Sequence, residues 1–147
     1  MPHCNQVEFD NVVGDLLTTS AVLRLKTLRH HYGSRYDHSL RVAHNSYALA
    51  CKLGLDSRAV ARAGLLHDLF FHDATCRPAG YHGAPWKHPQ EAVSNAARLT
   101  PLTAKEQNII LAHMWPLSRN LPRSPEAWLV NVVDTVVAVG DWLRNRT

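Results

Sequence analysis

Histidine and aspartate residues that could bind a metal are spread along this 147-residue chain. The chain holds ten histidines, and they do not form a tract. Histidine is the commonest metal ligand and a frequent general acid or base, so this pattern suggests dispersed ligands. The first candidates are His67 and Asp68, which are adjacent at the end of the apolar segment 59–66. Burying such a pair costs free energy unless a metal, a salt bridge or a hydrogen bond compensates it.

Further candidates lie where expected helices begin, end or are interrupted. His38 opens an amphipathic segment on its apolar side, and Asp134 interrupts the valine-rich run 132–137. An unpaired carboxylate in such a run would be unfavourable. His88 lies at an expected helix start and His113 at an expected helix end, where side chains can converge on a cleft. The candidate metal ligands are therefore His38, His67, Asp68, His88, His113 and Asp134. They suit one or two divalent first-row metals, namely iron, manganese, cobalt or zinc, of which we favour iron.

The elements that must position these residues are expected to be helices. Apolar residues recur at spacings of three and four rather than two, which predicts helices rather than strands. Capping and stop signals place helices at about 16–30, 36–53, 56–66, 88–99, 103–114 and from 124 onward. We therefore expect an all-α fold, a compact single-domain bundle of five to seven helices. The domain would span 1–147, with its core at about 20–143.

Composition narrows the partners. Apolar residues make up 46% of the chain and charged residues 19%, which allows a continuous core. The formal net charge is +4, but the basic residues are scattered, so no nucleic-acid or membrane partner is expected. The most apolar stretch, 127–140, is too short to span a bilayer. We see no signal peptide and expect a cytoplasmic protein, for which a homodimer is compatible.

The cysteines, the other histidines and the tryptophans are not expected to bind a metal. The three cysteines are far apart and form no CxxC pair, so neither a disulfide framework nor a zinc knuckle is predicted. A further set of histidines is expected at the surface: His3, His30, His31, His44 and His82. The tryptophans are expected in the core or on the wall of the cleft: Trp86, Trp115, Trp128 and Trp142.

The order His38, His67-Asp68, Asp134 resembles the H…HD…D pattern that defines the HD-domain superfamily. The flanking strings look like those of small bacterial HD phosphohydrolases: Tyr36-Asp-His-Ser-Leu-Arg-Val-Ala43, Gly64-Leu-Leu-His-Asp68, His88-Pro89 and His113-Met-Trp-Pro-Leu117. The resemblance implies two metals. His38, His67, Asp68 and Asp134 would hold one, and His88 and His113 would hold the other, with Asp68 bridging. The implied activity is hydrolysis of small phosphate esters or nucleotides by a metal-activated water.

Residues close to these ligands are candidates for catalysis and for substrate binding. Beside Asp68, the candidate catalytic residues are His72 and Asp73, which could transfer protons or could simply be solvated loop residues. The candidate phosphate-binding residues are Lys87, Arg119 and Arg123, with Arg41 a further cation that could serve.

The sequence also departs from the patterns of other HD-domain proteins, and these departures leave the function open. Leu69, Phe70 and Phe71 stand where many HD phosphodiesterases have a lysine, and the Glu-Asp pair of alarmone hydrolases is absent directly after the His67-Asp68 pair. Two alternatives therefore stay open: a mixed-valent di-iron oxygenase on the same scaffold, and a non-enzymatic metal-bearing regulatory module.

Overall fold

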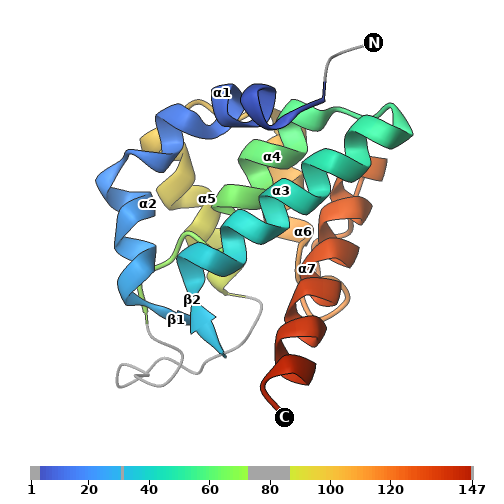
Figure 1. The fold of residues 1–147 in the computed structure, drawn as a ribbon. Coiled ribbons are helices and arrows are strands. Elements are labelled where there is room, and N and C mark those ends of the chain that lie inside the picture. The colour runs from blue at the N-terminus through green and yellow to red at the C-terminus, as the bar shows by residue number, and fades with distance from the viewer. Residues whose placement is uncertain (1–3, 31, 73–86, 147) are drawn as a thin grey trace.

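The computed structural model describes residues 4–30, 32–72 and 87–146 (Figure 1). These residues form seven α-helices, one 3-10 turn and one two-stranded sheet, so the predicted all-α class is confirmed. The helices are α1 (Gln6–Leu17), α2 (Ser20–Arg24), α3 (Arg35–Leu53), α4 (Ser57–Leu66), α5 (His88–Leu99), α6 (Ala104–Ala112) and α7 (Pro125–Arg144). The 3-10 turn is η1 (Leu25–Thr27), and the antiparallel strands are β1 (Arg29–His30) and β2 (Gly33–Ser34).

Several helix ends expected beyond the first helix are confirmed. Asp56 accepts a hydrogen bond from the Ala59 backbone N–H at the start of α4. Thr103 and Glu106 form the expected capping box of α6. Gly54 ends α3 in the left-handed conformation, at φ 69°, which glycine adopts without steric cost.

The N-terminal third differs from the sequence prediction. One helix was expected at 16–30, but α1 begins earlier and ends at Leu17, and α2, η1 and β1 follow. The break comes from Thr19, whose hydroxyl donates to the Leu16 carbonyl and accepts from the Val22 backbone N–H. A threonine that bonds its neighbouring backbone in this way ends one helix and caps the next. Because α1 contributes Phe9 to the core, the core extends before residue 20.

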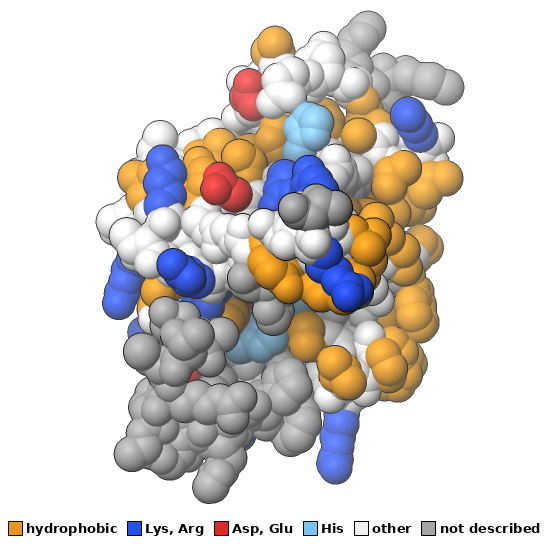
Figure 2. Space-filling model, turned by 60° about the horizontal axis from the view of Figure 1, so that its bottom comes forward, with side chains coloured by type: hydrophobic (Ala, Val, Ile, Leu, Met, Phe, Trp, Pro, Cys, Tyr) orange, Lys and Arg blue, Asp and Glu red, His pale blue; other side chains and the backbone are white. Residues whose placement is uncertain are grey.

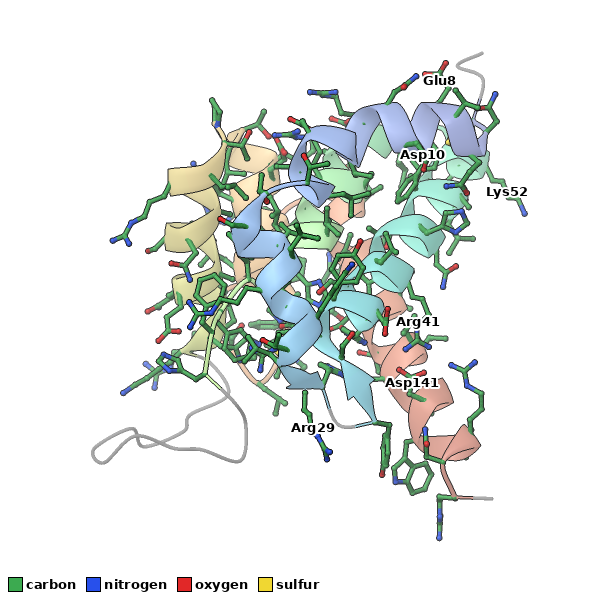
Figure 3. The ribbon with its side chains drawn as sticks, turned by 60° about the vertical axis from the view of Figure 1, so that its left-hand side comes forward. Glu8, Asp10, Arg29, Arg41, Lys52 and Asp141 are labelled. Atoms are coloured by element: carbon green, nitrogen blue, oxygen red, sulfur yellow. A yellow bond between two sulfur atoms is a disulfide. The ribbon has the colours of Figure 1, made fainter. Side chains whose placement is uncertain are left out.

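Close packing of α3 against α4 brings two of the histidine-bearing segments together. A Cβ added at Gly64 would lie 3.1 Å from the Cα of Ala43, so glycine permits this approach. On its other side, α3 runs beside α7 (Figure 1). In Figure 3, Arg41 of α3 and Asp141 of α7 point toward each other. They form a bidentate ion pair, with 2.7 Å between Arg41 Nη2 and Asp141 Oδ2.

Two tryptophans of α7 lie at the surface, where they were not expected. Trp128 and Trp142 of α7 are 46% and 42% exposed rather than packed in the core. Hydrophobic side chains gather along the right-hand edge of Figure 2, the side on which α7 lies in Figure 1. Trp86 lies outside the described residues.

Within the described part of the chain, no helix combines the length and apolar character that crossing a bilayer needs.

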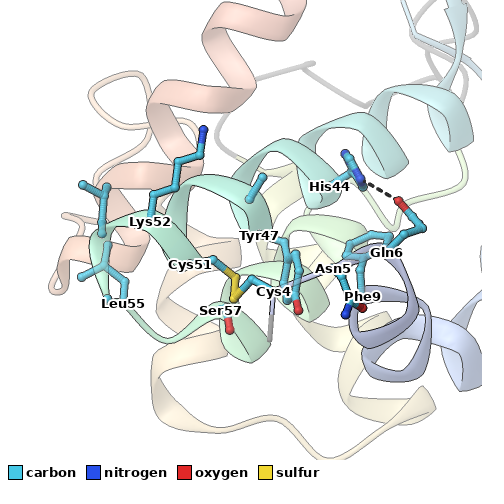
Figure 4. Close-up of a pocket in the computed structure, with 13 residues that line it drawn as sticks. Cys4, Asn5, Gln6, Phe9, His44, Tyr47, Cys51, Lys52, Leu55 and Ser57 are labelled. Carbon is cyan, nitrogen blue, oxygen red and sulfur yellow. Dashed lines mark hydrogen bonds between the residues drawn. A yellow bond between two sulfur atoms is a disulfide. The ribbon is translucent and has the colours of Figure 1, made fainter. Parts of the chain in front are cut away.

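A disulfide joins Cys4 to Cys51, although no disulfide was predicted (Figure 4). It fastens the segment before α1 to the last turn of α3, along a surface pocket of about 800 Å³. Spacing along the chain did not reveal it, because the 47-residue separation closes only when α1 folds back over α3. Cys76 lies outside the described residues.

Candidate metal centre

Five helices deliver the six predicted ligands to one place. Each side chain comes from a helix or from its end: His38 from α3, His67 and Asp68 from the end of α4, His88 from the start of α5, His113 from the end of α6, and Asp134 from α7. His38, His67, Asp68 and His113 are buried. No single element carries more than two of the six residues. The cluster therefore forms only when the five helices pack together.

Asp68 lies between two groups of nitrogen donors and presents a different oxygen to each. Its Oδ1 atom lies 3.4 Å from His88 Nε2 and 3.4 Å from His113 Nε2. Its Oδ2 atom lies 3.4 Å from His67 Nε2. A carboxylate with one oxygen toward each of two donor groups has the geometry of a bridging ligand.

The donor group on the Oδ2 side is completed by α3 and α7. His38 Nε2 lies 2.7 Å from Asp134 Oδ1, and His67 Nε2 lies 3.4 Å from the same oxygen. On the Oδ1 side, His88 Nε2 and His113 Nε2 are 3.0 Å apart. Neighbouring ligands of one ion with bonds of about 2.1 Å are about 3 Å apart, so both groups have suitable spacing.

Backbone carbonyls fix the orientation of two of the rings. His67 Nδ1 donates to the Gly64 carbonyl at 2.6 Å, and His113 Nδ1 donates to the Ile110 carbonyl at 2.7 Å. Both histidines directly follow a helix, where the ring reaches the carbonyl three residues earlier. A donating Nδ1 leaves the Nε2 atom of the neutral ring as the metal-binding atom, and such carbonyl contacts typically support metal-bound histidines.

The His67 Nε2 atom shows that the cluster fits a cation. It is buried and, among the described residues, has no hydrogen-bond partner, although two carboxylate oxygens lie 3.4 Å away. Burial opposes a charge on this ring, but Asp68 and Asp134 outweigh burial and raise the pKa of His67 well above its usual value. A site that draws a proton so strongly in its metal-free form suits a metal ion in the proton's place.

Both carboxylates stay ionised, the form that binds metal. Burial would raise the pKa of Asp68, but His67 lowers it well below its usual value, with help from His113 and His88. The pKa of Asp134 is likewise lowered against burial, chiefly by His67 and His38.

Two residues beside the cluster were not predicted from the sequence to lie there. His30 was expected at the surface, but β1 places it against His38, with parallel rings 3.7 Å apart, and its Nε2 atom lies 3.7 Å from Asp68 Oδ2. Parallel rings so close cannot both hold one ion in their planes, so His30 lies beside the ligands. Asn131 is buried on α7, and its side-chain amide donates to the carbonyls of residues 112, 113 and 115. Its position one turn before Asp134, in an apolar helix, was the available signal.

Of the predicted catalytic residues, Asp68 belongs to the cluster, whereas His72 contacts a residue outside it. The His72 imidazole lies 3.2 Å from Glu91 of α5, and Asp73 lies outside the described residues. The predicted phosphate-binding cations are exposed, and with the described residues none of them forms an ion pair: Lys87, Arg119 and Arg123. Of these, Lys87 directly precedes the cluster residue His88. Arg41 is held by Asp141 instead.

A helical bundle that converges on a cluster of histidines and aspartates defines a metal-binding α-helical domain. The HD-domain family profile matches residues 35–138, most of the chain, and this protein belongs to that family. The matched range contains all six clustered residues. HD domains form a superfamily of metal-dependent phosphohydrolases, and the His/Asp groups here could hold a divalent metal. A search of curated proteins found no match.

Proposed function

We propose that this protein is a phosphohydrolase with two metal ions that acts on small phosphate esters or nucleotides. The observation that carries the proposal is the placement of Asp68, with one oxygen toward His67 and the other toward His88 and His113. Two donor groups joined by one carboxylate are what a two-metal hydrolase requires.

The residues divide between the two ions according to these distances. His38, His67, Asp68 and Asp134 would hold one metal, and His88, His113 and the other oxygen of Asp68 would hold the second. Bound metals would supply hydroxide near neutral pH and withdraw charge from a phosphoryl oxygen. Four imidazoles and two carboxylates suit iron, manganese, cobalt or zinc, and we favour iron.

The chain's own residues prepare this site. The Gly64 and Ile110 carbonyls hold His67 and His113 with their Nε2 atoms toward the cluster. The ionised carboxylates of Asp68 and Asp134 offset the charge of a bound cation in a buried site. Lys87, beside His88, is exposed and free to meet a phosphate oxygen.

Other residues of the chain are proposed for the remaining phosphate-binding and proton-transfer roles. Arg119 and Arg123, between α6 and α7, are further candidates for binding phosphate. His72 and Asp73 remain candidates for proton transfer to the leaving group, and His72 would have to leave Glu91 to act in the cluster.

The test is reconstitution of the full chain under anaerobic conditions with each candidate metal, followed by metal analysis and a substrate screen. The screen covers phosphomonoesters, nucleotides and dinucleoside polyphosphates, with phosphate release and oxygen consumption measured in parallel. His67→Ala should lose both bound metal and turnover, and His88→Ala should lose mainly one metal. His44→Ala, an exposed histidine on α3 outside the cluster, is the matched control and should change neither.

Each alternative has a distinct result. Oxygen consumption coupled to an organic substrate, with no phosphate ester cleaved, would identify a di-iron oxygenase and refute hydrolysis. Metal binding with neither activity in any reconstituted form would favour a regulatory module. A protein that binds at most one metal after full reconstitution would refute the two-metal arrangement.

A further inference from the structure

The outer face of α7 is largely apolar, and its inner face carries Asn131 and Asp134 among buried apolar residues. Asn131 is buried against the end of α6, and Asp134 faces the metal cluster. Between Glu126 and Asp141, Asp134 is the only charged residue of this helix. A surface helix normally carries charged side chains on its outer face. The outer face of α7 therefore lacks the character of a surface made for water.

This face is made of Thr135, whose hydroxyl donates to the Asn131 carbonyl, and of six large apolar side chains. These six are 42% to 63% exposed and are Trp128, Val132, Val136, Val139, Trp142 and Leu143. Spacings of three and four place them in one stripe along the helix. Together they expose a patch on the order of 500 Å², at the upper end for monomeric proteins. Figure 2 shows hydrophobic side chains gathered along this edge of the molecule.

The stripe is nearly symmetric about Val136. Val132 and Val139 lie four residues before it and three after it, and Trp128 and Leu143 lie eight before and seven after. A second α7, antiparallel to the first, would therefore set Val132 against Val139 of the other copy and Trp128 against Leu143. Two-fold interfaces pair one surface patch with itself in this way.

We infer that this face is the interface between two copies of the chain, related by a two-fold axis near Val136. Burying the stripe on both copies would remove roughly 1,000 Å² from water, about the least that a specific interface needs. The outer face bears no charge from Ala127 to Gly140, so no like charges would oppose each other along it. A second copy thus matches the stripe in length, in symmetry and in apolar character.

The test measures the mass of the metal-loaded full chain by sedimentation equilibrium at micromolar concentration. The wild type should show twice the 16.5 kDa mass of one chain. Val136→Lys and Val136→Glu should each be monomeric, because residue 136 lies beside the axis, close to residue 136 of the other copy. An equal mixture of the two variants should recover the dimer, since opposite charges then meet. Val7→Lys, at a 66% exposed valine of α1, should leave the dimer intact.

A second test uses disulfide cross-linking, so it does not require the charged variants to fold. Val136→Cys in a Cys76→Ser background should form a disulfide-linked dimer on mild oxidation, whereas Val7→Cys in the same background should not. A monomeric wild type, or a dimer that persists in both charged variants, would overturn the inference. Co-sedimentation of a monomeric wild type with anionic lipid vesicles would instead make the stripe a membrane-binding face and would also overturn it.

Discussion

Asn131 should determine how well His113 is positioned, although it is not a metal ligand. Its side-chain amide donates to the carbonyls of Ala112, His113 and Trp115 at 3.0 to 3.1 Å. The Ala112 carbonyl also accepts from the Trp115 backbone N–H, so Asn131 ties the turn that follows α6 to α7. Replacing Asn131 removes two buried N–H donors, and at about 1.5 kcal/mol for each lost bond the free energy of unfolding should fall by about 3 kcal/mol.

The same change should weaken the second metal. Without Asn131 the end of α6 is free to shift, and residues that support a metal-bound histidine typically change metal affinity by about 10- to 100-fold. Asn131→Asp separates the loss of these hydrogen bonds from a loss of packing. The aspartate side chain keeps the shape of asparagine but turns an oxygen, in place of the N–H donors, toward three carbonyls. It should therefore be at least as damaging as Asn131→Ala.

The assays are denaturant unfolding of the metal-free protein and titration of metal into it. Asn108→Ala is the matched control, because Asn108 also bonds backbone groups but lies away from the cluster: its side chain joins Leu121 and Arg123. A positioning role for Asn131 is refuted if Asn131→Ala is no less stable than Asn108→Ala. It is equally refuted if Asn131→Ala keeps both metals at wild-type affinity.

Three further outcomes are expected. Metal at about 100 times its dissociation constant should stabilise the wild type by about 2.7 kcal/mol, and Asp134→Asn should shrink this gain in a melting experiment with and without chelator. Cys51→Ser should lower the free energy of unfolding by about 4 kcal/mol in non-reducing denaturant titrations, since the disulfide to Cys4 closes a 47-residue loop; equal stability of variant and wild type would contradict this. Asp141→Asn should cost about 1 kcal/mol at neutral pH. Because Arg41 and Arg144 outweigh burial and lower the pKa of Asp141, this difference should be present above about pH 4 and vanish as acid protonates the carboxyl, as unfolding across a pH series would reveal.

The helical class, most helix boundaries beyond the first helix, and the identity of the six clustered residues could all be predicted from the sequence. Asp56, Thr103 with Glu106, and Ser124 act on backbone groups only three residues away. Such local effects are readable from the sequence, because they do not depend on the rest of the fold. The cluster was readable for another reason, since buried histidines and aspartates in apolar helices need a compensating partner.

Which residues surround those six depends on how distant segments pack. His30 comes next to His38 because the short β1–β2 sheet leads into α3, and no periodic pattern announces a two-residue strand. The disulfide between Cys4 and Cys51 likewise forms only when α1 lies across the end of α3.

The two faces of α7 show the same division. The sequence marked Asn131 and Asp134 as interruptions of an apolar run, and its periodicity placed both on one side of the helix. Which side faces inward depended on partners contributed by α3, α4 and α6. The imidazoles of His38 and His67 and the backbone carbonyls at the end of α6 hold Asp134 and Asn131 on the inner side, and the two tryptophans of α7 were left outside.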